Sequence, residues 1–220
     1  MIKLVIFDWN GTLIADTRAC MDTDNEVIKA FGGNPVDLKT YRDTIIIPAI
    51  DFYTQHGCDR KELEADFKRV GKIFHDYYEP RVANCRTRRS VREVLKSLKQ
   101  KSIESIILSN HTLEGIQFQL TRLKISDYIA RVLANSEKDS SMRERNKQRR
   151  LTQYLELGEY ESNEITIVGD SPEEVEIGKA LGLRTVAITG GYYSTSRLRA
   201  SNPDYLITNI KELIAIIQLS

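Results

Sequence analysis

The feature that most constrains the fold is a series of short runs rich in β-branched and other apolar residues, most of them followed by a helical pattern. Near-continuous apolar character is typical of parallel strands that helices cover on both faces. The alternation therefore predicts an α/β protein with a mostly parallel sheet. The expected strands are Lys3–Phe7, Ile103–Leu108, Ile129–Leu133, Ile165–Val168, Thr185–Ile188 and Tyr205–Ile207.

Several of the expected helices carry start signals. A Ser or Asn followed three residues later by Glu has the spacing of a capping box, in which each residue satisfies the other's exposed backbone N–H. Pro172 also stands at the favoured first position of a helix. The pairs with this spacing are Ser90 with Glu93, Ser171 with Glu174, and Asn209 with Glu212.

The alternation is interrupted between residues 16 and 85, where helical periodicity replaces it. Val27, Ile28 and Phe31 suggest a helix that ends before Gly32-Gly33. A second stripe, with steps of four, three, four and three, predicts one amphipathic helix face. It comprises Leu63, Phe67, Val70, Phe74 and Tyr77. We therefore expect a small helical domain, 16–85, inserted into a core made of 1–15 and 86–220.

The composition excludes several classes of protein. The chain has 32 Lys and Arg against 31 Asp and Glu, a formal charge of 32 − 31 = +1, which argues against a nucleic-acid binder. No apolar run approaches the ~20 residues that a membrane span needs. The three cysteines show no metal-ligand spacing. A cytoplasmic protein, monomeric or homodimeric, is expected.

Two carboxylates follow predicted strands at the point where each strand ends. Asp8 follows the first strand, and Asp170 follows the strand that ends at Val168. Ligands of open α/β sheets bind at this end of the strands. If the two strands are neighbours, paired carboxylates without nearby His or Cys favour an oxygen-ligated cation such as Mg²⁺. Ser109 and Asn110, after the second strand, are suited to hold phosphate oxygens near a helix start.

Together these motifs resemble the haloacid dehalogenase superfamily, and most closely its phosphoglycolate-phosphatase-like branch with an inserted helical cap. The resemblance covers 1–15 and 86–220, while 16–85 matches only as a helical insertion. It implies a Rossmann-like, three-layer core. The matching motifs, in order, are Asp8-x-Asn10-Gly11-Thr12-Leu13, Ser109, a lysine, Gly169-Asp170-x-x-x-Glu174, and the tail segments Ala187-Ile188-Thr189-Gly190-Gly191-Tyr192 and Pro203-Asp204-Tyr205.

The resemblance implies a mechanism and a role for each matching residue. Asp8 would attack a phosphoryl group and form an aspartyl phosphate that water hydrolyses. Mg²⁺ would be held by Asp8, the main-chain carbonyl of Asn10 and Asp170. Ser109 and a lysine would bind the phosphoryl oxygens, with Gly11, Thr12 and Asn110 shaping the phosphate site. Lys147 is the preferred lysine, because Leu151, Leu155 and Leu157-Gly158 follow it at the family's spacing, and Lys138 is the alternative.

The chain departs from the family pattern at Asn10. Phosphatases of the family usually have a second Asp here, which protonates the leaving oxygen and activates the water. Asn cannot exchange a proton near neutral pH, and general acid–base help is typically worth ~10²–10⁴-fold in rate. The sequence therefore leaves three functions open: a slow or selective phosphatase of a small phosphorylated metabolite, a phosphotransferase with a long-lived phosphoenzyme, or a phosphate-binding protein without turnover. Dehalogenation fits less well, because the acidic pair Asp170 and Glu174 suits a metal.

Some residues keep two interpretations at this stage. Glu174 either lies near the metal or only caps its helix, and His111 either faces the phosphate or is a surface residue. A cluster of basic residues either draws in an anionic substrate or only faces solvent. The cap should open and close through hinges near Ala15–Asp16 and Cys85–Thr87. The basic cluster is Arg86, Arg88, Arg89 and Arg92, and the cap residues that either line the pocket or belong to the cap's own core are Tyr41, Arg42, Phe52 and Tyr53.

Overall fold

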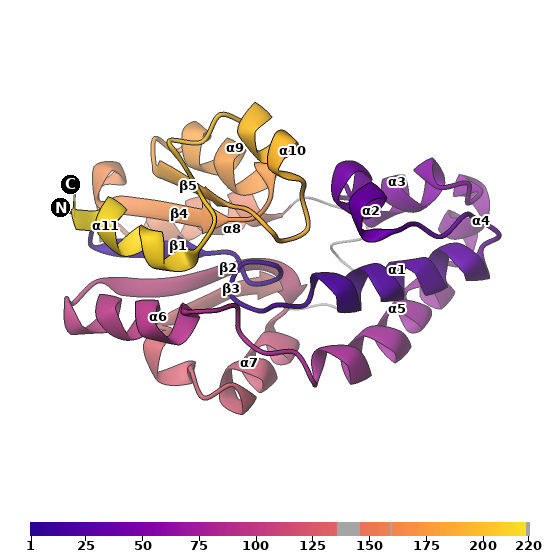
Figure 1. The fold of residues 1–220 in the computed structure, drawn as a ribbon, viewed down its shortest axis with the longest axis horizontal. Coiled ribbons are helices and arrows are strands. Elements are labelled where there is room, and N and C mark those ends of the chain that lie inside the picture. The colour runs from indigo at the N-terminus through magenta and orange to yellow at the C-terminus, as the bar shows by residue number, and fades with distance from the viewer. Residues whose placement is uncertain (136–145, 159, 219–220) are drawn as a thin grey trace.

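The centre of the molecule is a six-stranded sheet in which every neighbouring pair is parallel (Figure 1). The computed structural model describes residues 1–135, 146–158 and 160–218. The strand order is β3-β2-β1-β4-β5-β6, so β1 lies in the middle, between β2 and β4. The strands are β1 (Leu4–Phe7), β2 (Glu104–Thr112), β3 (Arg131–Asn135), β4 (Ile165–Gly169), β5 (Arg184–Ile188) and β6 (Tyr205–Ile207).

Helices cover both faces of the sheet, which gives the three-layer α/β architecture expected from the alternation (Figure 1). On β1, Val5 and Phe7 pack with α6, α7 and α11, while Leu4 and Ile6 pack with α8 and α9. Successive side chains of a strand point to opposite faces, so an apolar run is buried on both. The helices outside the insertion are α6 (Val91–Gln100), α7 (Leu113–Arg122), α8 (Lys147–Leu155), α9 (Pro172–Ala180), α10 (Thr195–Ala200) and α11 (Leu213–Gln218).

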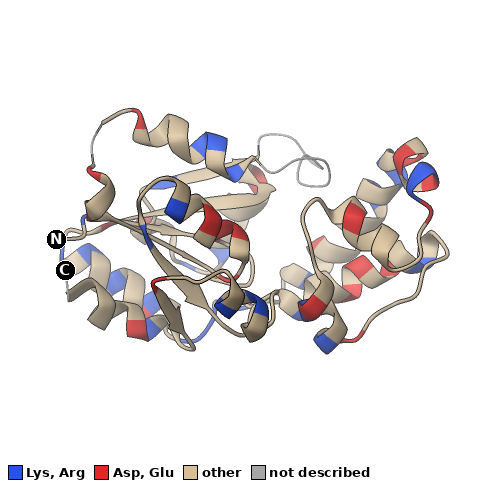
Figure 2. Ribbon diagram, turned by 90° about the horizontal axis from the view of Figure 1, so that it is seen from above, with Lys and Arg blue, Asp and Glu red and all other residues tan. Residues whose placement is uncertain are grey.

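The segment between β1 and α6 forms helices that lie together at one end of the molecule, as Figures 1 and 2 both show. Their apolar side chains form a second cluster, which also includes Tyr193 and Leu198 of the sheet-bearing part. The expected helical insertion is therefore present, while the boundaries 16 and 85 stay a prediction. The helices are α1 (Thr17–Ala30), α2 (Leu38–Thr44), α3 (Ala49–Gln55), α4 (Arg60–Ala65) and α5 (Phe67–Val82).

The prediction of one continuous helix face from Leu63 to Tyr77 is wrong in two respects. The chain breaks between α4 and α5 at Asp66, whose side chain accepts a hydrogen bond from Arg69 N and caps α5. An Asp cap competes with helix continuation. Tyr77 is also 39% exposed, whereas Tyr78 is buried at 1%. The neighbouring residue is therefore the one that faces the interior.

Two of the three expected capping boxes form. Ser171 and Asn209 have extended backbones, and each exchanges hydrogen bonds with the Glu three residues later. Ser90 instead has φ +67°, in the left-handed region, and its side chain caps nothing. An N-cap normally needs an extended backbone to aim its oxygen at the helix, so the Ser90–Glu93 prediction is wrong.

The second strand runs further than the sequence indicates. It continues through Ser109 and Asn110 to Thr112, with a shift in its register to β3 after Leu108. The side chain of Thr112 then accepts a hydrogen bond from Gly115 N and starts α7. The helix start expected beside Ser109 and Asn110 therefore lies at Thr112, and the two residues belong to an irregular strand end.

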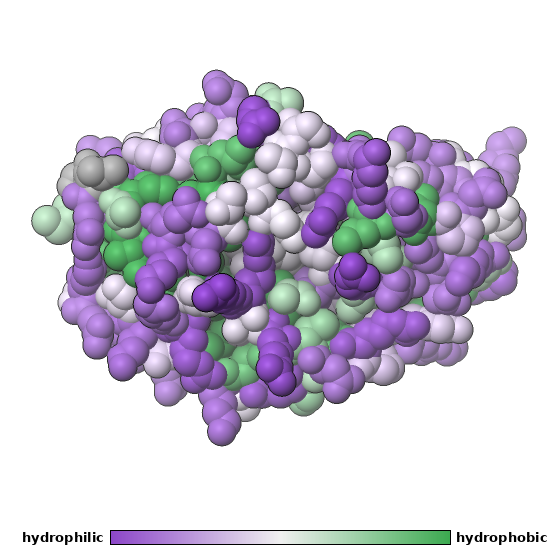
Figure 3. Space-filling view, in the orientation of Figure 1, coloured by the Kyte–Doolittle hydropathy of each residue, from purple (hydrophilic) through white to green (hydrophobic). Residues whose placement is uncertain are grey.

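The surface is mixed in character. On the face shown in Figure 3, hydrophobic residues occur in separate patches among hydrophilic ones. Across the described part of the chain, no helix combines the length and the apolar character needed to cross a bilayer. The described residues with large, exposed apolar side chains are Met1, Tyr77, Phe118 and Leu157.

Candidate active site

Asp8 sits at the carboxyl end of the central strand. Its backbone N–H donates to Val168 O on β4 at 2.9 Å, which fixes the residue beside that strand. The chain then turns sharply through Gly11, with φ +71°, a conformation that favours glycine. The N–H groups of Leu13 and Ile14 both donate to Trp9 O and close the turn. The turn leaves the carboxylate of Asp8 95% buried, at the edge of a cavity.

Asp170 follows β4, and the pairing of β1 with β4 brings it beside Asp8. The hydroxyl of Thr12 lies between them, 3.2 Å from Asp8 Oδ2 and 2.9 Å from Asp170 Oδ1. A hydroxyl has one proton, so it cannot donate to both carboxylates at once. In the structure, the Thr12 side chain therefore connects the two acids.

Two glycines let the backbone approach Asp170 closely. A Cβ atom at Gly11 would lie 2.3 Å from Asp170 Oδ2, and one at Gly191 would lie 2.1 Å from the same oxygen. The N–H of Tyr192 donates to this oxygen at 2.5 Å. Asp170 is therefore held in one orientation by main chain on two sides, with its other oxygen toward Thr12.

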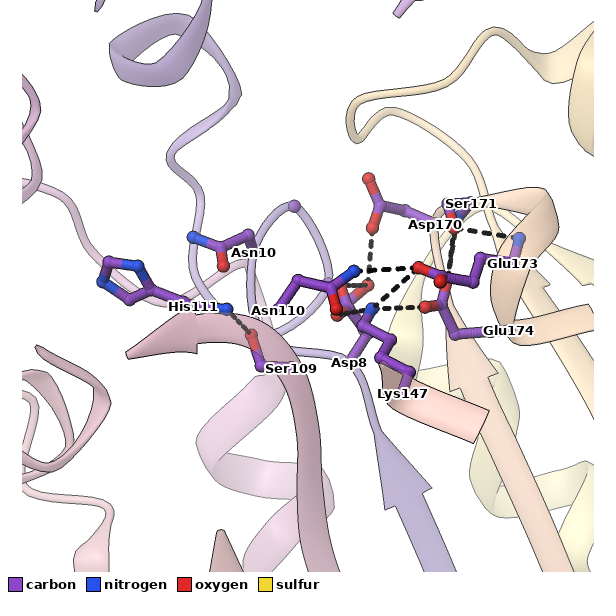
Figure 4. A network of polar contacts seen from close by, with 12 residues as sticks. Asp8, Asn10, Ser109, Asn110, His111, Lys147, Asp170, Ser171, Glu173 and Glu174 are labelled. Atoms are coloured by element: carbon purple, nitrogen blue, oxygen red, sulfur yellow. Dashed lines mark hydrogen bonds and ion pairs between the residues drawn. The ribbon is translucent and has the colours of Figure 1, made fainter. Parts of the chain in front are cut away.

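Lys147 begins α8 and reaches across to both strand ends. Its Nζ lies 2.6 Å from Asp8 Oδ1, 2.5 Å from Glu174 Oε1 and 3.9 Å from Glu173 Oε2 (Figure 4). The residue is buried, with 4% of its surface exposed. The preferred lysine of the sequence analysis is thus placed with Asp8. The alternative, Lys138, lies outside the described residues.

Glu174 caps its helix, as one of the two interpretations of the sequence expected, and it also forms an ion pair with Lys147. Its Oε2 accepts hydrogen bonds from the backbone N–H and the hydroxyl of Ser171, which closes the capping box at the start of α9. Its Oε1 forms the ion pair with Lys147. A Cβ at Gly169 would come within 2.3 Å of Glu174 Cγ, so only glycine leaves room for this side chain.

Ser109 and Asn110, at the end of β2, also line the cavity. The Oγ of Ser109 accepts a hydrogen bond from His111 N at 3.0 Å, which leaves its own proton free to be donated. The side chain of Asn110 donates to Glu173 Oε2 at 2.9 Å. His111 also lines the cavity, 5.5 Å from the ring of Tyr78, and burial lowers its pKa.

Asn10 points its amide nitrogen away from Asp8, as Figure 4 shows. The amide donates to Asp16 Oδ2 at 2.7 Å and to the hydroxyl of Tyr78 at 2.8 Å. Asp16 also accepts from Gly11 N and from the hydroxyls of Tyr78 and Tyr192 at 2.7 to 2.9 Å. Asn10 is therefore fixed by a buried carboxylate that the sequence analysis treated only as part of a hinge.

Burial and neighbouring charges shift the pKa values of the two aspartates and of the lysine. Burial raises the pKa of Asp8 well above its usual value, and attraction to Lys147 offsets part of this increase. Burial also raises the pKa of Asp170, to about 6. Burial alone would lower the pKa of Lys147, but the surrounding acids raise it well above its usual value. The lysine is thus a permanent cation among more acids than it can neutralise.

These side chains line a cavity of about 140 Å³ between the strand ends and the inserted helices. From the predicted set, Asp8, Asn10, Ser109, Asn110, Lys147 and Asp170 face it. Gly11 and Thr12 lie behind the carboxylates instead. Within the described residues, no three His, Cys, Asp or Glu side chains are grouped as a metal site. A cation here would therefore need main-chain or water oxygens beside the two aspartates.

Two arginines of the basic cluster, Arg88 and Arg92, bind backbone carbonyls. Arg88 donates to the carbonyl oxygens of Gly11 at 2.7 Å and of Thr189 at 2.6 Å. Arg92 donates to Leu123 O. Neither residue faces the cavity. Arg88 therefore connects the turn after Asp8 to the chain beyond β5. The sequence had suggested only attraction of a substrate or exposure to solvent for this residue.

A comparison with models of protein families shows which family the chain belongs to. A family model described as haloacid dehalogenase-like hydrolase matches residues 5–188. The chain belongs to the haloacid dehalogenase-like hydrolase family. The expectation drawn from the ordered motifs is confirmed, and so is the expectation of a hydrolase of the phosphatase kind.

Curated relatives of this family member match over nearly their whole lengths. The phosphoglycolate phosphatase of Vibrio parahaemolyticus is 23% identical, with 100% of this chain and 97% of the relative covered. That of Photorhabdus laumondii is 26% identical, with 99% and 93% covered. The resemblance to the phosphoglycolate-phosphatase-like branch is therefore confirmed.

Solved structures confirm the fold. A predicted phosphatase from Clostridium acetobutylicum superposes with a TM-score of 0.83 at 16% identity, covering 100% of both chains. A predicted phosphoglycolate phosphatase from Haemophilus somnus gives a TM-score of 0.76 at 23% identity, covering 98% of this chain and 97% of the other. The haloacid dehalogenase-like core and the helical insertion are thus shared across the whole chain.

Several cavity residues of this family member were missed by the sequence analysis. Tyr78 was missed because the helical stripe pointed to Tyr77, and Tyr192 because it was noted only as part of the tail motif. Asp24, on α1, carried no signal that distinguishes it from a surface acid. Tyr41 and Tyr53, which had been left open, do line the cavity, whereas Phe52 packs in the cluster behind them.

Proposed function

We propose that the chain is a Mg²⁺-dependent phosphomonoesterase that hydrolyses a small phosphorylated metabolite through an aspartyl phosphate on Asp8. The observation that carries the proposal is the position of Asp8 at the end of β1, facing the cavity, 2.6 Å from Lys147 and joined to Asp170 through Thr12. A carboxylate nucleophile needs a neighbouring cation and an open approach for the phosphoryl group, and both are present.

The donor set fits Mg²⁺. Asp8 and Asp170 supply carboxylate oxygens that Thr12 cannot satisfy together. The main-chain oxygen of Asn10 would add a third ligand. When bound, the metal would neutralise charge on the nucleophile and on the phosphoryl oxygens.

The remaining residues support an in-line displacement. Asp8 forms a bond to phosphorus as the bond to the leaving oxygen breaks, and water then cleaves the aspartyl phosphate to release inorganic phosphate. Lys147 would hold the phosphoryl oxygens, after giving up part of its contact with Asp8. Ser109 would donate its free proton to another phosphoryl oxygen, since its Oγ already accepts from His111 N.

Asn10 limits the chemistry of the leaving group. Its amide is held by Asp16 and Tyr78, and an amide cannot supply a proton. Esters with good leaving groups should therefore react much faster than alkyl phosphates. The aspartyl phosphate should also persist, because no general base stands at this position to activate water.

We also propose that 16–85 acts as a cap that opens over the cavity. The two connections between cap and core run side by side, with Ala15 N donating to Arg86 O at 2.9 Å and a bridge between Ile14 and Thr87. Because the two connecting segments are hydrogen-bonded to each other, they can bend together as one hinge. The hinge positions expected from the sequence, Ala15–Asp16 and Cys85–Thr87, include this pairing.

The test is hydrolysis of p-nitrophenyl phosphate, whose leaving group needs no protonation. With Mg²⁺ the wild type should turn over, and Asp8→Asn should lose at least about 10³-fold in kcat. Asp22→Asn, the same change at an exposed residue of α1, should keep the wild-type rate. Equal rates for wild type and Asp8→Asn would show that Asp8 is not the nucleophile. Phosphate binding without turnover would instead establish a non-catalytic phosphate-binding protein, the alternative that Asn10 keeps open.

A further inference from the structure

The end of the cavity that faces the inserted helices contains a buried carboxylate. Asp24 on α1 is 3% exposed and lines the cavity. The hydroxyls of Tyr41 and Tyr53 donate to it, each at 2.8 Å, and the thiol of Cys20 donates at 3.6 Å. None of these three donors carries a charge. The leaving group of a phosphomonoester placed for in-line attack by Asp8 would extend away from Asp8, toward this end.

The described hydrogen-bond partners of Asp24 include no cation that would balance the charge of its ionised form. Burial raises its pKa to about 6, and the phenol hydrogen bonds limit the increase. Among the described residues that line the cavity, only Lys147 and His111 are basic. Lys147 is engaged by Asp8 and Glu174, and burial lowers the pKa of His111. The wall around the leaving group is therefore acidic.

Two nearby arginines keep their positive charge but donate to backbone carbonyls outside the cavity lining. Arg42 donates to the carbonyls of Gly190 and Gly191, both at 2.9 Å. Arg197 donates to Ile45 O at 2.6 Å. Neither side chain lines the cavity. Both arginines fasten the inserted helices to the core instead of binding a substrate.

The same end of the cavity is rich in aromatic rings. The rings of Tyr41 and Tyr192 meet edge to face, with centroids 6.1 Å apart. Phenol rings attract ammonium groups through their π faces, most strongly where water is excluded. A buried carboxylate beside several phenols is thus complementary to a cation. The tyrosines that line the cavity are Tyr41, Tyr53, Tyr78, Tyr192 and Tyr193.

We propose that the preferred substrate is the phosphomonoester of an amino alcohol, with its ammonium group bound between Asp24 and the surrounding tyrosines. The proposal rests on the phosphomonoesterase function proposed above and names its substrate class. Water and the ester would give the amino alcohol and inorganic phosphate, so that no further reactant is needed. A leaving group that ends in a carboxylate, such as glycolate, would instead meet Asp24 with a like charge.

The test compares three two-carbon phosphomonoesters that differ in their terminal group. Phosphoethanolamine ends in an ammonium, 2-hydroxyethyl phosphate in a hydroxyl, and phosphoglycolate in a carboxylate. With Mg²⁺, kcat/KM should decrease in that order, with at least about a tenfold difference between the first and the last. Phosphoglycolate as the best of the three substrates would overturn the proposal.

Two variants connect the preference to Asp24. Asp24→Asn should reduce the ratio of kcat/KM for phosphoethanolamine over phosphoglycolate by about tenfold. Asp22→Asn, an exposed control on the same helix, should leave the ratio unchanged. An unchanged ratio in a folded Asp24→Asn protein would overturn the assignment of Asp24. If that variant does not fold, the order of the three esters on wild type still decides.

The failure of this inference is distinguishable from failure of the proposed function. Turnover of p-nitrophenyl phosphate together with a preference for the carboxylate ester would reject only the substrate class. If p-nitrophenyl phosphate is not hydrolysed, the proposed function fails, and calorimetric titration of the three esters with Mg²⁺ then reports the charge preference of the cavity alone. Weaker binding of phosphoethanolamine than of phosphoglycolate would reject the substrate class in that case too.

Discussion

Asn10 and Asp16 form a carboxamide–carboxylate pair next to the nucleophile, and their side chains can be exchanged. In Asn10→Asp alone, two carboxylates would meet at the 2.7 Å now spanned by a hydrogen bond, and like charges at this distance disfavour a double negative charge. In Asn10→Asp with Asp16→Asn, the hydrogen bond re-forms with its direction reversed. We expect the double variant to hydrolyse alkyl phosphates at least about tenfold faster than wild type, as general acid help returns. Steady-state kcat on 2-hydroxyethyl phosphate measures this.

The matching control uses a different leaving group. On p-nitrophenyl phosphate the departing oxygen needs little protonation, so the double variant should show a much smaller gain in the first, phosphorylating step. The single variant Asp16→Asn should show no gain on either ester, because it adds no acid. If the double variant is no faster than wild type on alkyl phosphates, missing proton transfer is not what limits turnover.

Lys147 should stabilise the folded protein in addition to binding the phosphoryl oxygens. Lys147→Met keeps the aliphatic stem but leaves Asp8 and Glu174 buried without their cation, and removing one partner of a buried ion pair costs about 3–5 kcal/mol. Urea unfolding at pH 7 should show this loss of free energy. Adding Glu174→Gln should restore part of it, because one uncompensated charge is removed while Gln still fits a capping box. Lys211→Met, on an exposed lysine, should change stability little, and an equal loss there would contradict the account.

At the scale of elements, Asp24 makes the packing of α1 against α2 and α3 dependent on pH. Its pKa is about 6 in the folded protein and 3.8 in the ordinary state. Below about pH 4 both states are protonated and the residue has no effect. Between about pH 4 and 6 the unfolded chain ionises first, so folding loses up to about 3 kcal/mol. Asp24→Asn should remove this loss.

The measurement is urea unfolding of wild type and Asp24→Asn from pH 4.5 to 7.5. The unfolding free energy of the variant relative to wild type should increase with pH and level off above about pH 6. A constant difference across this range would show that the carboxyl group has an ordinary pKa. Asp22→Asn, an exposed residue on the same helix, should give a pH-independent difference.

The sheet was predictable from the sequence because its strands are short, apolar and buried on both faces. All six expected strands are present, with small changes at their ends. The helical insertion was less predictable, since its elements are set by local competition. The N-cap residue Asp66 divides one expected helix into two. The left-handed backbone of Ser90 prevents the capping box that the spacing alone predicts.

At the scale of the whole molecule, the core side of the cavity followed from the sequence, while its other side did not. Asp8 and Asp170 meet because parallel strands present their ends at one edge and because β1 and β4 are neighbours. The sequence predicted the strand ends but left open which strands are neighbours. Tyr78 and Tyr192 reach Asp16 across separations of 62 and 176 residues. No local pattern encodes such contacts, so a single sequence could not place them.

The net charge of the molecule does not show how its charges are distributed around the cavity. The formal charge of +1 does not reveal that, among the described residues lining the cavity, one lysine faces several acids. Arginines near this cavity bind main-chain carbonyls and join the inserted helices to the core. The negative charge of the cavity would be balanced by a divalent cation at one end and by an ammonium group at the other.

The central claim is that Asp8 carries the phosphoryl group during turnover. Wild-type protein turning over p-nitrophenyl phosphate with Mg²⁺ is quenched in acid, digested and analysed by peptide mass spectrometry. A phosphoryl group is expected on Asp8 in a substantial fraction of the molecules, because Asn10 leaves hydrolysis of the aspartyl phosphate without a general base. Continued release of phosphate with no phosphoryl group on the Asp8 peptide would contradict it.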